Sequence, residues 1–222
     1  MSVAFPFAGL EFEPRESGAL WCASARVLVV SDLHLGKSER IARRGGALLP
    51  PYETVQTLDR LSDEVERLGP EVIVSLGDSF DDLDAADGLH PEARRRLTVL
   101  MAGRRWIWIE GNHDPGPTAF GGEHLESWRL GDVTFRHIAL GAAEGPEISG
   151  HYHPKASLTV RGRRLTSPCF VVDAPRLIMP AFGAYTGGLR VSAPALRGLL
   201  GPDACVRLTR APHHAIPLAL VA

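Results

Sequence analysis

Three runs of apolar residues dominate the first half of the chain. They span residues 26–32 (RVLVVSD), 71–78 (EVIVSLGD) and 104–114 (RRWIWIEGNHD), and each run ends in polar residues. A continuous apolar run of this length is typical of a strand that is buried on both faces of a parallel sheet. The pattern therefore predicts three buried strands, each followed by a polar loop.

Helical periodicity separates these strands. Apolar residues recur at three- and four-residue steps after the first strand: Val55, Leu58, Leu61, Val65 and Leu68. This spacing predicts one face of a helix, and Pro51 before it and Gly69 after it are typical of helix boundaries. The segment HPEARRRLTVLMAG predicts a second helix with His90 at its start. The alternation of strands and helices indicates an α/β first half with parallel strands.

The second half changes character. The segments DVTFRHIAL, PEISGHYHP, ASLTVRG, TSPCFVVD and RLIMPAFG predict short, mostly antiparallel strands, with one weak helix near APALRGLL. Before the first buried strand, GLEFEP and GALWC predict a short hairpin. We therefore expect a four-layer α/β/β/α sandwich, in which two packed mixed sheets are flanked by helices. The length of 222 residues suits a single domain over residues 1–222.

Composition excludes several classes of protein. The net charge is −2, so no strong overall field favours nucleic acid or membrane. The three cysteines are scattered and form no CxxC pair, which argues against disulfides and against a thiolate zinc site. The N-terminus does not resemble a signal peptide, and no apolar run is long enough to span a bilayer. We expect a cytoplasmic protein without membrane contact.

Metal-ligand residue types follow each buried strand. The carboxyl ends of strands in open α/β sheets form the binding crevice, so these loops should meet there. The residues are Asp32, His34, Asp78, Asn112, His113 and Asp114, and the second half adds His137, His151 and His153. Each motif alone could be an ordinary turn or a surface histidine. Their joint occurrence at strand ends favours a metal site built from carboxylates, an amide and imidazoles, which suits Mn, Fe or Zn.

The segment SGHYHP places His151 and His153 two positions apart. If this segment is extended, the two imidazoles point to the same side. They could then bind one metal ion together, or one each of two neighbouring ions. We expect no site at His90, His124, His213 or His214.

The motifs SDLHLGK, GDSFDD, GNHD and GHYHP resemble, in order, those of the calcineurin-like metallophosphoesterases. Longer stretches, GALWCASARVLVVSDLHLGKSERIARRGGALLPPYETVQTLDRL and SPCFVVDAPRLIMPAFGAYTGG, look like the bacterial DNA-ligase-associated branch, described as a ligase-associated DNA damage response endonuclease. The resemblance covers about residues 18–188. Two loops depart from that branch: GDSFDDLD lacks the histidine often found there, and RHIAL lacks the usual Glu-Pro.

The resemblance implies two divalent metal ions, with Mn expected first and Fe or Zn as alternatives. It implies that Asp78 bridges both ions. One ion would be completed by Asp32, His34 and His153, and the other by Asn112, His137 and His151. His113 would be the general acid for the leaving alkoxide or would stabilise transition-state charge, and Asp114 would orient it.

The leading functional hypothesis is a two-metal phosphodiesterase that acts as a DNA endonuclease or end-processing enzyme in DNA repair, in association with DNA ligase, helicase and exonuclease-like proteins. One alternative is hydrolysis of a small phosphoester, nucleotide or lipid-linked pyrophosphate. Another, a non-catalytic scaffold, is disfavoured because the ligand set and His113 are present. Candidate substrate contacts are Lys37, Arg43 and Arg44; Arg40 and the cluster Arg161, Arg163 and Arg164 are further basic residues. All could instead be solvated charges.

Overall fold

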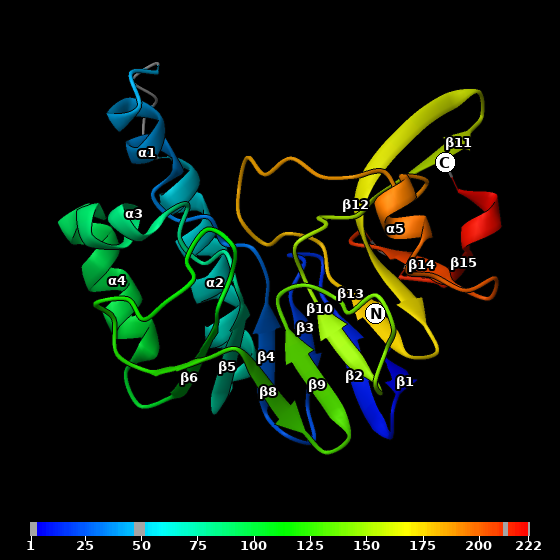
Figure 1. Ribbon diagram of the computed structural model, residues 1–222, viewed down its shortest axis with the longest axis horizontal. Coiled ribbons are helices and arrows are strands. Elements are labelled where there is room, and N and C mark those ends of the chain that lie inside the picture. Colours follow the sequence, from blue (N-terminus) through cyan, green and yellow to red (C-terminus); the bar gives the residue numbers. More distant parts are fainter. Residues whose placement is uncertain (1–3, 47–51, 211–212, 222) are drawn as a thin grey trace.

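A computed structural model describes residues 4–46, 52–210 and 213–221 (Figure 1). Its first sheet runs in the order β1-β2-β3-β4-β5-β6-β7. The strands are β1 Phe5–Phe7, β2 Leu10–Pro14, β3 Leu20–Cys22, β4 Val27–Val30, β5 Val72–Leu76, β6 Arg105–Ile109 and β7 Glu123–Leu125. β4 to β7 pair in parallel, and β1 to β4 pair antiparallel. The three buried strands and the N-terminal hairpin expected from the sequence are therefore confirmed.

Helices α2 (Tyr52–Leu68) and α4 (Pro91–Met101) cover one face of this sheet. The periodic face of α2 is buried at Leu58, Leu61 and Val65, whereas Val55 lies at its edge and is exposed. The N-cap of α4 is His90, whose side chain accepts a hydrogen bond from the backbone N–H of Glu92. The expected boundary at Pro51 lies outside the described residues.

Two further helices, α1 (Lys37–Arg43) and α3 (Leu83–Gly88), were not expected from the sequence. Their short sequences carry too few apolar residues to give a helical period. Polar contacts fix them instead: the Ser38 backbone N–H donates to the Glu53 carboxylate at 3.0 Å, and the Asp82 side chain caps α3 by accepting from Ala85 N at 2.7 Å. Both helices follow loops that carry candidate ligands, so their contacts fix those loops.

The second sheet runs in the order β15-β14-β12-β13-β10-β9-β8, with β11 paired to β12. The strands are β8 Ser127–Leu130, β9 Val133–Arg136, β10 Glu147–Ser149, β11 Lys155–Val160, β12 Arg163–Asp173, β13 Arg176–Ile178, β14 Cys205–Leu208 and β15 Ile216–Pro217. Most pairs are antiparallel, as expected, and β10 alone among these strands pairs in parallel, with both β9 and β13. The connection over residues 137–146 returns the chain to the start of β9, which brings the carboxyl ends of β9 and β10 together.

The two sheets pack face to face around an apolar core that includes Phe12, Ile107, Phe135 and Phe170. On the outer face of the second sheet, a smaller apolar cluster packs beneath α5 (Pro194–Arg197) and the 3-10 turn η1 (Leu218–Leu220). The expected four-layer sandwich is therefore confirmed, with a thin fourth layer. Figure 1 shows α1 to α4 on one side and α5 on the other. Among the described residues, no helix is long and apolar enough to cross a membrane.

Candidate metal centre

The candidate ligands lie in loops at the carboxyl ends of five strands. Because β4, β5 and β6 run parallel, as do β9 and β10, the loops that follow them open at the same edge of each sheet. These loops contribute Asp32 and His34 after β4, Asp78 after β5, Asn112 and His113 after β6, His137 after β9, and His151 and His153 after β10. The structure brings all of these residues together.

A first group consists of Asp32, His34 and His153. One ligand atom from each lies within 4.8 Å of the other two. His153 Nε2 lies 3.1 Å from Asp32 Oδ1, and it is buried without a hydrogen-bond partner. Asp32 is itself fully buried and accepts hydrogen bonds from the Ser31 hydroxyl and the His151 backbone N–H. The group thus holds a fixed carboxylate and a buried imidazole nitrogen facing each other.

A second group consists of Asp78, His137 and His151, whose ligand atoms also lie within 4.8 Å of one another. His137 Nε2 is its centre. It lies 2.9 Å from Asn112 Oδ1, 3.2 Å from His151 Nδ1 and 3.4 Å from Asp78 Oδ2. All three of these atoms are lone-pair donors.

The hydrogen bonds of His137 show why a cation fits here. His137 Nδ1 lies 2.8 Å from the carbonyl oxygen of Leu76, which cannot donate, so Nδ1 carries a proton. In the neutral ring Nε2 then presents a bare lone pair to the oxygens of Asn112 and Asp78. A positive species, either a proton on Nε2 or a metal ion, relieves this repulsion. The oxygen and imidazole donors around it suit Mn, Fe or Zn.

The pKa values of the metal-free site follow the same logic. Burial lowers the pKa of His137, but the hydrogen bond to Asp78 and the charges of Asp32 and Asp78 outweigh it, so the pKa is raised. Burial raises the pKa of Asp78, yet its contacts with His137 and His113 bring it down to about 2. Burial lowers the pKa of His151, and the neighbouring charge of His137 lowers it further. The carboxylates are therefore ionised and ready to bind a cation.

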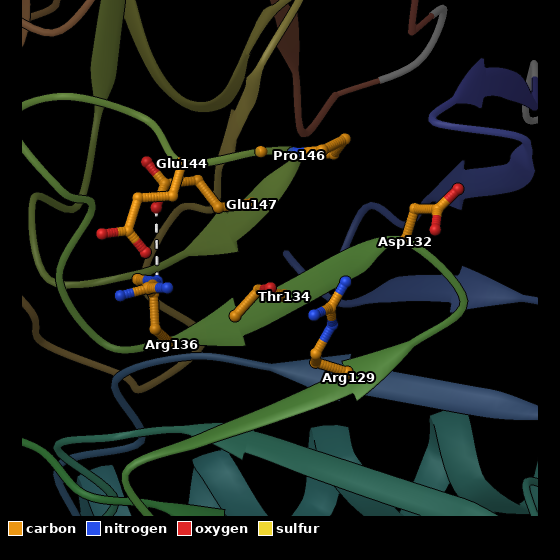
Figure 2. Close-up of a pocket in the computed structure, with 8 residues that line it drawn as sticks. Arg129, Asp132, Thr134, Arg136, Glu144, Pro146 and Glu147 are labelled. Atoms are coloured by element: carbon orange, nitrogen blue, oxygen red, sulfur yellow. Dashed lines mark ion pairs between the residues drawn. The ribbon is translucent and has the colours of Figure 1, made fainter.

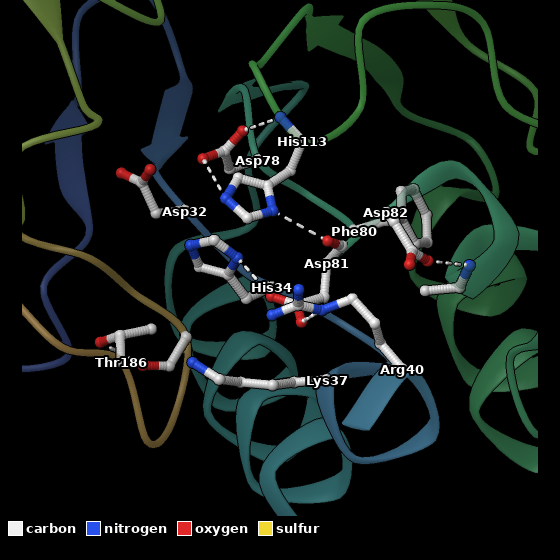
Figure 3. Close-up of polar contacts among 12 residues, drawn as sticks. Asp32, His34, Lys37, Arg40, Asp78, Phe80, Asp81, Asp82, His113 and Thr186 are labelled. Atoms are coloured by element: carbon white, nitrogen blue, oxygen red, sulfur yellow. Dashed lines mark hydrogen bonds and ion pairs between the residues drawn. The ribbon is translucent and has the colours of Figure 1, made fainter. Parts of the chain in front are cut away.

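The sequence analysis did not single out Asp81 as a site residue. Its carboxylate lies 2.9 Å from His34 Nδ1 and also pairs with the guanidinium of Arg40. Figure 3 shows Asp81 between these two side chains. Because His34 Nδ1 donates to Asp81, His34 Nε2 is left free for the first group, the arrangement by which carboxylates orient metal-binding histidines.

His34, Asp81 and His113 also form a group whose ligand atoms lie within 4.8 Å. Arg40 already places a positive charge against the Asp81 carboxylate. A cation at this third group would therefore be repelled by the guanidinium. The first two groups are the better fit to metal ions.

His113 lies beside the two groups. Its backbone N–H donates to Asp78 Oδ1 at 2.8 Å, and its Nδ1 donates to the carbonyl oxygen of Asp81 at 2.8 Å. Its Nε2 lies 4.0 Å from Asp78 Oδ2, and the side chain is 34% exposed. The ring is thus held by Nδ1 while Nε2 faces the site, where it can exchange a proton with a bound molecule.

Asp114 has a different position from the one expected. Its carboxylate accepts backbone hydrogen bonds from Asp78, Ser79, Phe80 and Gly111, at 2.8–3.2 Å. The atom that fixes His113 Nδ1 is the Asp81 carbonyl. Burial and the charge of Asp78 raise the pKa of Asp114 to about 6 against the effect of its backbone hydrogen bonds. Through these four hydrogen bonds, the Asp114 carboxylate holds the backbone of the loop that contains Asp78.

The candidate ligands adopt strained backbone conformations. Five of them have left-handed φ angles between 46° and 69°: Asp32, His34, Asp78, His151 and His153. A residue with a Cβ pays about 1–2 kcal/mol for this conformation. The condition that SGHYHP is extended is therefore not met: β10 ends at Ser149, and the histidine pair lies in a tight loop beyond it. Such outliers concentrate at functional sites.

Close packing against this loop requires a glycine at position 150. A Cβ at Gly150 would lie 1.8 Å from Ser31 Oγ and 2.6 Å from Asp32 Oδ2. The glycine therefore allows the loop after β10 to meet the loop after β4. This contact joins the two halves of the site.

The basic residues near the site are mostly paired. Arg43 Nη2 lies 2.5 Å from Asp82 Oδ1, and Arg44 lies 3.9 Å from Asp82 Oδ2. Lys37 Nζ donates to the Tyr185 carbonyl at 3.4 Å. In Figure 3 the Lys37 side chain reaches toward the segment that contains Thr186, beside His34 and Asp32. The more distant cluster Arg161, Arg163 and Arg164 is exposed at the turn of the β11–β12 hairpin.

The histidines that were expected to have no site role have other contacts. His124 stacks on Trp108, and His213 Nδ1 donates to the Leu208 carbonyl. A separate pocket of about 400 Å³ lies beside β9 and the start of β10 (Figure 2). Among its lining residues, Arg136 pairs with Glu147, which also pairs with Arg176. The Glu147 carboxylate thus ties two guanidiniums to the start of β10, which indicates a structural role.

Two neighbouring cation sites built from oxygens and imidazoles are the arrangement with which metal-dependent hydrolases act on phosphate esters. The chain belongs to this class as a member of the calcineurin-like phosphoesterases, whose family model matches residues 25–170. The family expected from the four motifs is thereby confirmed. A search of curated proteins found no match.

A comparison with solved structures found the crystal structure of Pseudomonas putida nuclease MPE. The two chains share 26% sequence identity and a TM-score of 0.73, with 98% of this chain and 100% of that chain covered. The match extends beyond the family model to nearly the whole chain.

Proposed function

We propose that this protein is a two-metal phosphodiesterase that cleaves DNA. The observation that carries the proposal is the pair of adjacent ligand groups, in which buried lone-pair donors face one another with Asp78 beside both His113 and His137. In this proposal one ion is held by Asp32, His34 and His153, and the other by Asn112, His137 and His151. Asp78 would contribute a carboxylate to both.

Bound at these residues, two divalent cations would supply electrophilic stabilisation of the phosphoryl oxygens and an activated water. The chain itself supplies orientation and a proton. Asp81 and Leu76 accept the Nδ1 protons of His34 and His137, which fixes the tautomer of each ring. The left-handed backbone at five of the candidate ligands fixes their positions, so little reorganisation is needed when a metal ion binds.

His113 is proposed as the general acid. With Nδ1 donating to the Asp81 carbonyl, only the imidazolium form carries a proton on Nε2, the atom that faces Asp78 and the site. That proton can pass to the leaving alkoxide as its bond to phosphorus breaks. The same positive ring would stabilise charge that develops on the transferring group.

The structural likeness to a nuclease supports nucleic acid as the substrate. The resemblance to the DNA-ligase-associated branch supports DNA in particular, a role in repair beside DNA ligase, helicase and exonuclease-like proteins, and a cytoplasmic location. Mn is the proposed ion because the mixed oxygen and imidazole donors suit it, with Fe or Zn as alternatives.

A second candidate is hydrolysis of a small phosphoester or nucleotide. The pairing of Arg43 and Arg44 with Asp82 favours it, because these arginines are then not free cations for a DNA backbone. Under the DNA proposal the arginines still contact phosphates, so Arg43→Ala combined with Arg44→Ala weakens DNA cleavage and spares a small nitrophenyl diester. Equal losses on both substrates would assign these arginines to the fold.

The test of the proposal is a substrate panel for the Mn-loaded protein: a nitrophenyl diester, the matching monoester, and single-stranded, nicked and duplex DNA. We expect turnover of the diester and of at least one DNA, and EDTA should abolish both. Activity on the monoester or a nucleotide alone would overturn the DNA proposal in favour of the second candidate. Inactivity on every phosphate ester would overturn the enzyme assignment.

A further inference from the structure

The loop over residues 183–188 contacts the candidate metal ligands at both of its ends. At its start, Gly183 N–H donates to the Asp32 carbonyl at 3.0 Å, and the preceding Phe182 N–H donates to the Ser31 carbonyl at 2.7 Å. At its end, a Cβ at Gly188 would lie 2.3 Å from the carbonyl oxygen of His153. The loop therefore spans from one candidate ligand of the first group to another.

The two lysines of the chain both hold this loop. Lys37 Nζ donates to the Tyr185 carbonyl, and Lys155 Nζ donates to the Thr186 carbonyl, each at 3.4 Å. Lys37 follows the loop after β4, and Lys155 follows the histidine pair, so the two ammonium groups come from different parts of the site. These bonds fix the middle of a segment that contains three glycines.

Tyr185 stands at the middle of this fixed loop. Its side chain is 72% exposed, the highest value among the exposed large hydrophobic residues of the described ranges. Its φ angle is 56°, a left-handed value that glycine adopts freely and that costs a residue with a Cβ about 1–2 kcal/mol. Packing does not account for a large ring kept in solvent at this cost, because most of the ring is in contact with water.

The reach of the chain keeps Tyr185 close to the metal groups. It lies two residues from Gly183, so the two Cα atoms are at most about 7 Å apart. Gly183 is in turn bonded to Asp32. A phosphodiester bound at Asp32, His34 and His153 would therefore place its neighbouring nucleotide within reach of the tyrosine ring.

We propose that Tyr185 is a stacking platform for an unpaired nucleobase next to the scissile phosphate. This inference rests on the proposed function and narrows its substrate to nucleic acid with a single-stranded or splayed-out nucleotide at the cut. Metal ions held by these ligands would contact the phosphate and not the base, and the net charge of −2 gives no broad attraction to a polyanion. An exposed aromatic ring supplies affinity for any base, because every base has a π face.

Two substitutions isolate the ring. Tyr185→Asn removes it while keeping a residue that tolerates the left-handed conformation. Tyr185→Phe keeps the ring and removes only the hydroxyl. Stacking on an aromatic side chain is worth about 1–3 kcal/mol, which corresponds to about 5- to 150-fold in affinity. We expect Y185N to lose that factor in kcat/KM on single-stranded DNA and Y185F to stay within about two-fold of wild type.

Two substrates complete the experiment: an oligothymidylate and an oligomer of equal length built from abasic nucleotides. The abasic oligomer has the same phosphodiesters and charge but no base. Y185N and wild type should cleave it equally, and melting temperature and metal content should match in both proteins. An equal loss on both oligomers would overturn the stacking role and assign Tyr185 to loop structure.

The outcomes separate this inference from the proposed function. If wild-type protein cleaves the single-stranded DNA and Y185N cleaves it equally well, the platform is wrong and the nuclease stands. If wild-type protein hydrolyses a nitrophenyl diester but neither binds nor cuts any oligonucleotide, the proposed function fails and this inference fails with it. A wild-type preference for fully paired duplex would also contradict the inference, because a paired base cannot stack on the ring.

Discussion

The Asp81 carboxylate accepts a hydrogen bond from His34 Nδ1 at 2.9 Å, while the Asp81 carbonyl oxygen accepts one from His113 Nδ1 at 2.8 Å. One residue thus orients a candidate metal ligand and the candidate general acid through different atoms. Substitution of the side chain disturbs the contact with His34 and the ion pair with Arg40, but it leaves the contact with His113, because the carbonyl remains. This separation allows the two roles to be tested independently.

We predict that Asp81→Asn lowers metal affinity about 10- to 100-fold, the usual effect of removing a carboxylate that orients a metal-binding histidine. Titration of the metal-free protein with Mn measures this. Asp82→Asn is the matched control, since asparagine retains the cap of α3 and Asp82 pairs with Arg43 rather than His34. Equal affinities for D81N and D82N would show that the contact with His34 is not functional.

His113→Ala should separate chemistry from metal binding. Metal content should stay at the wild-type level, while turnover of substrates with poor leaving groups falls by about 10²- to 10⁴-fold. The loss should shrink for nitrophenolate, which needs little protonation as it leaves. Steady-state rates on alkyl and nitrophenyl diesters measure the difference, and an equal loss on both would rule out general acid catalysis by His113.

Gly150→Ala should damage the site by steric overlap with the Ser31 and Asp32 side chains. The added Cβ would overlap Ser31 Oγ, so the loops after β4 and β10 must separate. Overpacking of this kind costs about 1–3 kcal/mol of unfolding free energy, and metal affinity should fall with it. Gly145→Ala is the control, because a Cβ there meets nothing within 4 Å. Urea unfolding and Mn titration of both variants test the prediction; a native-like G150A would contradict the contact.

Metal binding should release protons near neutral pH. The contacts of His137 with Asp78 and Asp32 raise its pKa despite burial. In the metal-free protein a proton therefore competes with a metal ion for His137 Nε2. Because the folded pKa is raised above the ordinary 6.5 of histidine, metal affinity should weaken as pH falls through this raised pKa, where Nε2 takes up a proton. Calorimetric titration in buffers of different ionisation enthalpy measures the protons released. A pH-independent affinity would show that His137 is not a ligand.

The strands, and the meeting of the candidate ligand loops at their carboxyl ends, could be predicted from the sequence. The apolar runs before Asp32, Asp78 and Asn112 are buried strands, and parallel pairing brings their ends together for a general reason that needs no coordinates. Helix α2 followed from its period in the same way. These features depend on local patterns, which a sequence displays directly.

Features that depend on tertiary contacts could not be predicted. The histidine pair follows a strand but lies in left-handed backbone, in a loop that packs against Ser31 where only a glycine fits at position 150. Asp81 stands three residues after Asp78 in GDSFDD, and nothing in the sequence shows that it reaches His34. Asp114, expected beside His113, bonds to backbone N–H groups that become neighbours only in the fold.

The central claim is that two adjacent metal ions share Asp78. Anomalous diffraction from crystals of the Mn-loaded protein tests it most directly. We predict two peaks about 3.5–4 Å apart, one against Asp32, His34 and His153, the other against Asn112, His137 and His151, with the Asp78 carboxylate between them. A single peak, or a peak at His34, Asp81 and His113, would contradict the account.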